Sequence, residues 1–244
     1  MPITEILLIG AIILLIIISI FDKSKQKVLT KEISLNRTYY ETIILLWLPV
    51  IFLANHITFS ILTFETIGLV WSNHWRAITG FSLLALLTIY FIYDLFSLVK
   101  DEKSQQKLAE QMQSLAWFMP KTKKQMFIFT IGLSVSAGIC EELIFRGYIL
   151  HELSEYFGVT LAVILSSALF GLCHFYQGVF NVIRTFIIGI VFCLVYLSVE
   201  TLIIPIILHI VLDAYGGIAS YIVRNSVKVD KCEVNENETD SLKV

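Results

Sequence analysis

The chain has 244 residues, of which 57% are hydrophobic and only 16% charged, with a mean hydropathy of +0.78. A soluble domain of this length carries more charge, so the excess apolar surface is expected to face lipid. The net charge of −2 gives no sign of a nucleic-acid partner.

Apolar runs of about 20 residues, long enough to cross a bilayer as helices, recur along the chain. We therefore predict an all-α polytopic transmembrane bundle of about seven spans, with six and eight as alternatives. The expected spans lie near 3–21, 39–60, 77–99, 123–145, 159–177, 182–199 and 202–223. The first is interpreted as a retained span rather than a signal peptide, because no basic region precedes it and no small-residue cleavage site follows.

Three segments depart from this simple pattern. The fourth span is expected to continue as a helix to about residue 155, since apolar residues keep helical spacing there. Residues 61–72 are apolar but short, which favours an interfacial or re-entrant segment. Residues 107–124 suit either a short amphipathic helix on the cytoplasmic face, ended by Pro120, or a simple connector.

Loop charge predicts the orientation of the chain. The connectors 22–38 and 100–124 are rich in lysine, whereas the loop 61–76 carries only Arg76. By the positive-inside rule the two basic connectors face the cytoplasm and the N-terminus lies outside. The polar tail 224–244 would then be cytoplasmic, and its composition predicts disorder.

The cysteines indicate neither a disulfide framework nor a zinc finger. No CxxC or Cys/His zinc-finger spacing occurs, and three of the four lie in apolar runs, where a thiol usually packs as a small hydrophobe. The four are Cys140, Cys173, Cys193 and Cys232.

Ionisable side chains inside apolar spans cost roughly 2.5–3.5 kcal/mol each on insertion scales, so each indicates pairing or function. Those away from the predicted span ends all fall in the C-terminal half. They are Glu141, Glu142, Arg146, His174, Arg184, His209 and Asp213. Apart from Arg184 they form three groups, each expected near the middle of its span and therefore able to meet at similar depth.

The first group combines two carboxylates with a guanidinium. Glu142 and Arg146 are four residues apart on one helix face and can pair, while Glu141 points about 100° away. A carboxylate among apolar neighbours suits a general base. The alternative is a buried ion pair that only fixes helix packing.

The second and third groups each contain a histidine. His174 follows Gly171 and 166–168, which form a small-residue face suited to close helix packing. His209 and Asp213 share a helix face, so the carboxylate can orient the imidazole. The alternative for His174 is a histidine that only packs between helices. The alternative for His209 and Asp213 is a local side-chain pair with no catalytic role. Together the groups supply a base, an orienter and an oxyanion stabiliser, although a proton relay could use the same set.

Three short motifs carry a family resemblance. They are EELIFR (141–146), FGLCH (170–174) and HIVLD (209–213), which match EExxxR, FxxxH and HxxxN/D. Their order and spacing resemble the CPBP family of intramembrane proteases, which includes type II CAAX prenyl endopeptidases and bacterial bacteriocin-processing and immunity proteins. The resemblance covers about residues 120–222. The chain is accordingly divided into N-terminal helices with a cytoplasmic connector (1–119), a CPBP-like core (120–223) and a disordered tail (224–244).

The resemblance implies an intramembrane endopeptidase that acts on a peptide or membrane-protein substrate. Carried over by motif, Glu141 and His174 would activate the attacking water. His209 and Asp213 would stabilise the oxyanion. The geometry of the site would be held by Glu142, Arg146 and Phe170.

The resemblance leaves the role of a metal open. Family members are often labelled metalloproteases, and a metal-free glutamate mechanism has also been proposed. The sequence accommodates both, because glutamate and histidine serve as zinc ligands or as acid–base groups. We expect no obligatory cofactor; if a divalent metal such as zinc binds, the candidate ligands are Glu141, His174 and His209.

Position 213 departs from the prenyl-endopeptidase branch, which has asparagine there. Asparagine can donate a hydrogen bond to an oxyanion, whereas ionised aspartate only accepts. Asp213 is therefore expected to orient His209 or to bind a metal. This departure favours the broader bacterial branch over a prenylated substrate.

Other functions remain open from the sequence. One is a non-catalytic immunity or scaffold protein, and another is a proton-coupled carrier, although no internal repeat is evident. A thiol protease using Cys173 and His174 is disfavoured, because adjacent helical residues point about 100° apart. In all cases we expect a multi-pass protein, in a bacterial cytoplasmic membrane, with the lipid bilayer as its surroundings.

Overall fold

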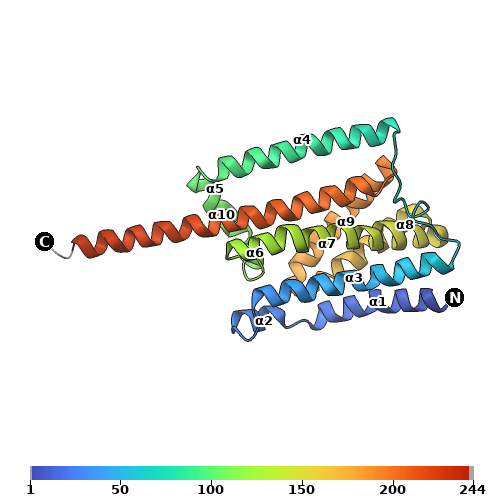
Figure 1. Cartoon of the computed structure of the whole chain (residues 1–244), viewed down its shortest axis with the longest axis horizontal. Helices are drawn as coiled ribbons and strands as arrows, with labels where there is room; N and C mark the ends of the chain where they lie inside the picture. The colour runs from blue at the N-terminus through green and yellow to red at the C-terminus, as the bar shows by residue number, and fades with distance from the viewer. Residues whose placement is uncertain (1, 242–244) are drawn as a thin grey trace.

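The computed structural model describes the backbone of residues 2–241 and the side chains of residues 2–226. Every regular element among the described residues is a helix, which confirms the predicted all-α bundle (Figure 1). In chain order they are α1 (Ile3–Phe21), α2 (Ser24–Leu29), α3 (Leu35–Phe59), α4 (Trp75–Leu98), α5 (Glu102–Gln111), η1 (Gln113–Leu115), α6 (Lys123–Phe127), η2 (Ile128–Leu133), α7 (Ser134–Glu141), η3 (Glu142–Ile149), α8 (Leu150–Leu172), η4 (Phe175–Gln177), α9 (Val179–Val199) and α10 (Ile203–Ser241).

Six helical stretches of the described chain are long and apolar enough to cross a membrane. The fourth of them, Lys123–Leu172, has 50 residues, more than twice the length that one crossing needs. Gly158 breaks this stretch within α8, with φ of 74° and ψ of 160°. Glycine adopts this backbone region without the steric cost that a Cβ would add. The stretch therefore contains both the fourth and the fifth predicted spans.

Helix ends differ from the prediction for local reasons. α3 begins earlier than expected because the Ser34 hydroxyl accepts a hydrogen bond from the Arg37 backbone N–H, at 3.3 Å. α8 ends at Leu172, before the predicted end of that span, and the chain turns through η4 and Gly178 (φ 102°). The prediction that His174 lies in the middle of a span is therefore wrong, since it lies just beyond the end of α8.

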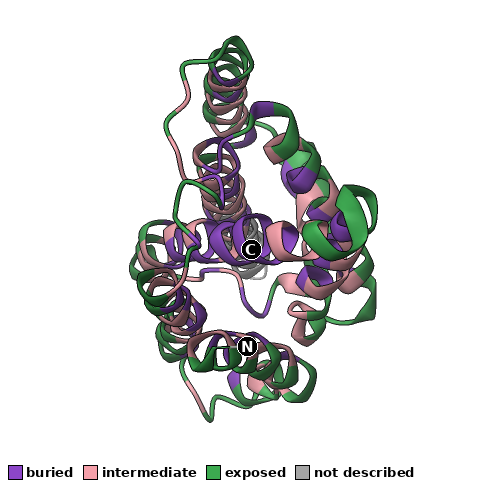
Figure 2. Ribbon diagram, turned by 90° about the vertical axis from the view of Figure 1, so that its right-hand side faces the viewer, coloured by how far each residue is buried: buried purple, intermediate pink, exposed green. Residues whose placement is uncertain are grey.

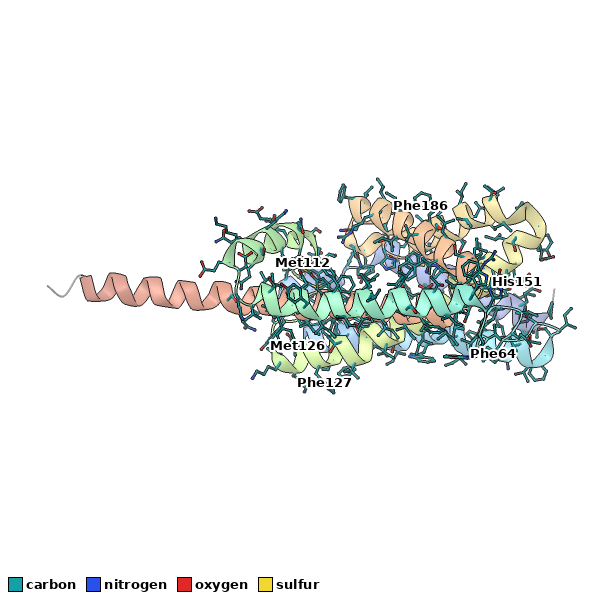
Figure 3. The ribbon with its side chains drawn as sticks, turned by 90° about the horizontal axis from the view of Figure 1, so that it is seen from above. Phe64, Met112, Met126, Phe127, His151 and Phe186 are labelled. Carbon is teal, nitrogen blue, oxygen red and sulfur yellow. The ribbon has the colours of Figure 1, made fainter. Side chains whose placement is uncertain are left out.

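The basic connectors gather at one end of the bundle, which we call the basic end. α2, α5 and the start of α6 lie there, while the N-terminus lies at the opposite, far end (Figure 1). Side chains of Met112 and Met126 mark the basic end, and those of Phe64 and His151 the far end (Figure 3). Such clustering is what the positive-inside rule requires of one membrane face. The cytoplasmic orientation of the basic end stays a prediction.

The loop 60–74 closes the far end over the middle of the bundle. It contains turns rather than a helix, and Ile67 within it is fully buried. The Gly68 carbonyl accepts from the Leu202 N–H at 2.8 Å, and the Thr201 hydroxyl donates to the Val70 carbonyl at 2.6 Å. The segment expected to be interfacial or re-entrant is thus a non-helical loop docked on the start of α10.

The connector after α4 packs against protein. In α5, Leu108 contacts a cluster formed by Leu98, Ala219 and Val223, so the apolar face of this helix lies on α4 and α10. Further along, the buried Tyr39 hydroxyl donates to the Phe118 carbonyl at 2.6 Å. An amphipathic helix therefore lies in this connector and its apolar side packs on other helices, but it ends at Gln111 rather than at Pro120 as predicted.

Burial separates an inner core from an exposed, largely apolar shell. Viewed along the helices, buried residues face inward and exposed residues line the outside (Figure 2). All residues of η3 are buried. The described cysteines, Cys140, Cys173 and Cys193, are free. Most of the tail predicted to be disordered, and Cys232 with it, lies outside the described side chains.

Candidate active site

The site is built around the carboxylate of Glu142, the first residue of η3. Its Oε1 accepts from Arg146 Nη1 at 3.0 Å and from His209 Nδ1 at 2.8 Å. The side chains of Glu142 and Arg146 are only 0% and 1% exposed. The predicted pair between these two residues is confirmed. It lies in a π-helical segment, a conformation found frequently at functional sites.

Aromatic rings and a carbonyl enclose the guanidinium of Arg146. Its Cζ lies 4.2 Å from the centre of the Phe170 ring and 5.1 Å from that of Phe192. Its Nη2 donates to the Gly189 carbonyl at 3.4 Å. Phe170 was expected near the site from its motif. Phe192 and Gly189 were not, because nothing distinguishes them within an apolar run.

His209 faces three carboxylates. Its Nδ1 bonds to Glu142, while its Nε2 lies 3.7 Å from Glu141 Oε2 and 3.7 Å from Asp213 Oδ2. Glu142 therefore orients the imidazole more closely than Asp213, which was expected to do so from its helical spacing. The Asp213 side chain is 39% exposed, the most of these four residues.

His174 has a defined tautomer. Its Nδ1 lies 2.9 Å from the Phe170 carbonyl, which can only accept, so Nδ1 carries the hydrogen. In a neutral ring, Nε2 then has a free lone pair. The ring also packs edge-on against Phe170, with centroids 4.9 Å apart. The side chain is thus held by the motif residue four positions before it.

A cavity of about 280 Å³ connects the site with the basic end. Glu141 and His174 lie in its wall, together with Cys140 and Cys173. Residues of α1 and α3 also line it, and the cavity extends to Asp22, Ser24 and Glu41 near the basic end. Glu141 thus lies between the cavity and His209. Its Oε2 has no hydrogen-bond partner among the described side chains.

Arg184 does not join the other ionisable residues. Its place in an apolar run predicts a buried charge, but its side chain is exposed on α9. A long arginine side chain on a helix can extend its charged end toward the headgroup region. The six remaining residues meet in one network or line one cavity.

The donor set does not fit a preformed zinc site. Within the described part of the chain, no group of three or more histidine, cysteine, aspartate or glutamate side chains has metal-binding spacing. Of the suggested ligands, His209 already engages Nδ1 with Glu142.

Residues 123–215 match the family model described as type II CAAX prenyl endopeptidase Rce1-like. This segment is an Rce1-like domain. The Rce1-like domain contains all three motifs, so the resemblance drawn from them is confirmed. With six apolar helical stretches, the chain is a multi-pass membrane protein that carries a CAAX-type protease domain. α1, α3 and α4 lie outside the match. No curated protein and no solved structure matches the chain.

Proposed function

We propose that the chain is an intramembrane endopeptidase that hydrolyses a peptide bond of a peptide or membrane-protein substrate with water activated by Glu141. The observation that carries the proposal is the place of Glu141. It lies in the wall of a cavity beside His174, with Oε2 3.7 Å from His209 Nε2. The Rce1-like domain supports a membrane protease in general.

Glu141 and His174 would activate the water together. With Nδ1 donating to the Phe170 carbonyl, neutral His174 can accept one water hydrogen at Nε2. Glu141 would take the other proton as the water oxygen attacks the substrate carbonyl carbon. Glu141 would then give this proton to the amine nitrogen as the C–N bond breaks, which leaves a free amine and a carboxylic acid that keeps the other water hydrogen.

His209 would stabilise the oxyanion. Its Nδ1 hydrogen is directed at Glu142, so Nε2 can donate only when the ring carries both protons. Glu141 and Asp213, each 3.7 Å from Nε2, attract this positive form. Arg146 balances the charge of Glu142, which keeps that carboxylate available as an acceptor. Asp213 would act through His209 rather than donate to the oxyanion itself.

Replacement of Glu141 tests the proposal. Purified protein in phosphatidylcholine vesicles is given an internally quenched peptide that ends in a Cys-aliphatic-aliphatic-X sequence, both S-farnesylated and unmodified. Glu141→Gln should lower kcat by about 10² to 10⁴, the usual contribution of a general base, with little change in thermal stability. Glu152→Gln, on α8 at the far end, is the matched control and should keep wild-type turnover. Full turnover by Glu141→Gln would exclude Glu141 as the base.

Comparison of the two peptide forms tests the substrate. Because aspartate occupies position 213, we expect cleavage of the unmodified peptide at a rate comparable with the prenylated one. A strict requirement for the prenyl group would instead place the chain with the prenyl endopeptidases in activity as well as in family.

Chelation tests the metal alternative. Since the described donors lack metal-binding spacing, activity should persist after exhaustive treatment with a strong zinc chelator. Loss of turnover that added zinc restores, at unchanged thermal stability, would show that a metal is required.

A further inference from the structure

Pro49 lies in the middle of α3 and is fully buried. Proline has no backbone N–H, so the carbonyl four residues earlier, that of Leu45, loses its helical donor. Inside a bilayer an unsatisfied carbonyl is costly and is tolerated mainly where another donor can reach it. The break in α3 therefore leaves a backbone acceptor in need of a partner.

The cavity lies beside this acceptor. In an α-helix a carbonyl points along the axis toward the residue four positions on. Leu45 and Pro49 both line the cavity, so the break in the helical hydrogen bonding lies on the cavity side of α3. Thr42, one turn earlier, also lines the cavity. Its hydroxyl donates to the Thr38 carbonyl at 2.9 Å, which leaves the oxygen free to accept.

The break in α3 and the site line the same cavity. Trp47 Nε1 donates to the Ser136 hydroxyl at 3.1 Å, which joins α3 to α7 shortly before Glu141. Side chains on a helix lean toward its N-terminus, so Glu141 points back toward this level. Glu141 on α7 and Pro49 on α3 line the same cavity.

We propose that the Pro49 break in α3 is a substrate-positioning element: the Leu45 carbonyl, assisted by the Thr42 hydroxyl oxygen, accepts hydrogen bonds from backbone N–H groups of the substrate. The inference rests on the proposed function. It implies that the substrate presents unpaired N–H groups, as an extended segment does and a helix does not. It also assigns substrate contacts to α3, which lies outside the Rce1-like domain.

Pro49→Ala is the central test, because alanine restores an N–H that can bond to the Leu45 carbonyl within the helix. The variant should be at least as thermally stable as wild type, since proline is unfavourable inside helices. Its kcat/KM for the quenched peptide should fall about fivefold to tenfold, mainly through KM, as expected for one lost hydrogen bond. A loss of activity without a loss of stability is not what a purely structural role for Pro49 would produce.

Thr42→Val gives a second variant that keeps side-chain shape. It should raise KM about twofold to fivefold. Thr58→Val is its matched control, because Thr58 lies on the same helix and donates to the Ala54 carbonyl at 2.8 Å in the same way, but is exposed. The control should keep the KM of wild type.

A substrate series identifies the hydrogen bond itself. The backbone N–H groups near the scissile bond are methylated one at a time. With the wild-type protein, methylation at one position should lower kcat/KM about fivefold to tenfold relative to the unmethylated peptide. With Pro49→Ala the same methylation should cause no further loss, because the hydrogen bond is already absent. An unchanged KM in Pro49→Ala, or equal methylation penalties in both proteins, would overturn the inference while leaving the peptidase intact.

Binding of the same peptides, measured by fluorescence anisotropy, separates the two proposals. Weaker binding to Pro49→Ala, with no cleavage by wild type, would uphold the positioning role and overturn the peptidase. Neither binding nor cleavage by wild type would overturn both.

Discussion

The N-terminal helices and the Rce1-like domain are both apolar, yet they bury their residues to different extents. In the most apolar windows of α3 and α4 only 17% and 11% of residues are buried, against 56% in Lys123–Leu172. Their ion pairs differ likewise. The Arg37–Glu41 pair at the start of α3 is 66% and 47% exposed, whereas Arg146 and Glu142 are nearly inaccessible. High hydropathy therefore indicates helices that contact lipid, whereas buried charged side chains indicate the candidate active site.

The largest expected effect sharpens the contrast between the two ion pairs. Arg146→Ala leaves the buried charge of Glu142 without its partner and should lower the free energy of unfolding by about 3–5 kcal/mol. Arg37→Ala breaks an exposed pair and should change it by less than about 1 kcal/mol. Thermal unfolding in detergent micelles measures both. Similar losses would show that burial does not distinguish the pairs.

Two buried histidines provide the next comparison. His209→Gln removes the proposed oxyanion donor and should lower kcat by about 10² to 10³. His56 is buried in α3, where its Nδ1 lies 3.0 Å from the Thr4 hydroxyl, far from the site in sequence and function. His56→Gln should reduce stability by about 1 kcal/mol and keep kcat. Peptide turnover and thermal unfolding of each variant check both statements, which fail if the two variants lose kcat equally.

Replacing each of two glycines with alanine should change the free energy of unfolding in opposite directions. A Cβ at Gly171 would meet the Val182 carbonyl at 2.9 Å, because α8 and α9 pack closely there. Gly171→Ala should therefore cost about 1–3 kcal/mol of stability. Gly10 in α1 has nothing within 4 Å of that position, so Gly10→Ala should stabilise the helix by up to about 1 kcal/mol. The unfolding temperatures of the two variants measure these changes. Equal shifts in unfolding temperature would contradict the difference in packing.

The smallest effect is expected at Asp213, whose side chain is 39% exposed, against 13% for Glu141 and 11% for His209. It lies 3.7 Å from His209 Nε2, beyond hydrogen-bonding distance, and Glu142 already orients the ring. Asp213→Asn should therefore change kcat/KM by no more than about tenfold, with stability near wild type. Steady-state cleavage of the quenched peptide measures this. A loss as large as that of His209→Gln would show that the charge of Asp213 is essential.

Much of the fold followed from counting apolar residues against bilayer thickness. The predicted spans are present, and the separation between the fourth and fifth falls at Gly158, where the helix breaks. The position of His174 was missed, since the aromatic residues Phe175 and Tyr176 extend the apolar run while the helix ends at Leu172. The hydropathy of a segment indicates whether its surroundings are apolar, but it does not indicate the residue at which a helix ends.

By itself the sequence determined the all-α class, the pair between Glu142 and Arg146 and the three motifs of the Rce1-like domain, because these depend on helical spacing over a few residues. Only the tertiary structure decided that Glu142 meets His209, 67 positions away, and that Phe192 covers Arg146. It alone brought Pro49 of α3 and Glu141 of α7 into the lining of one cavity. Such contacts join distant helices, and their register is set by side-chain packing between helices rather than by any local pattern.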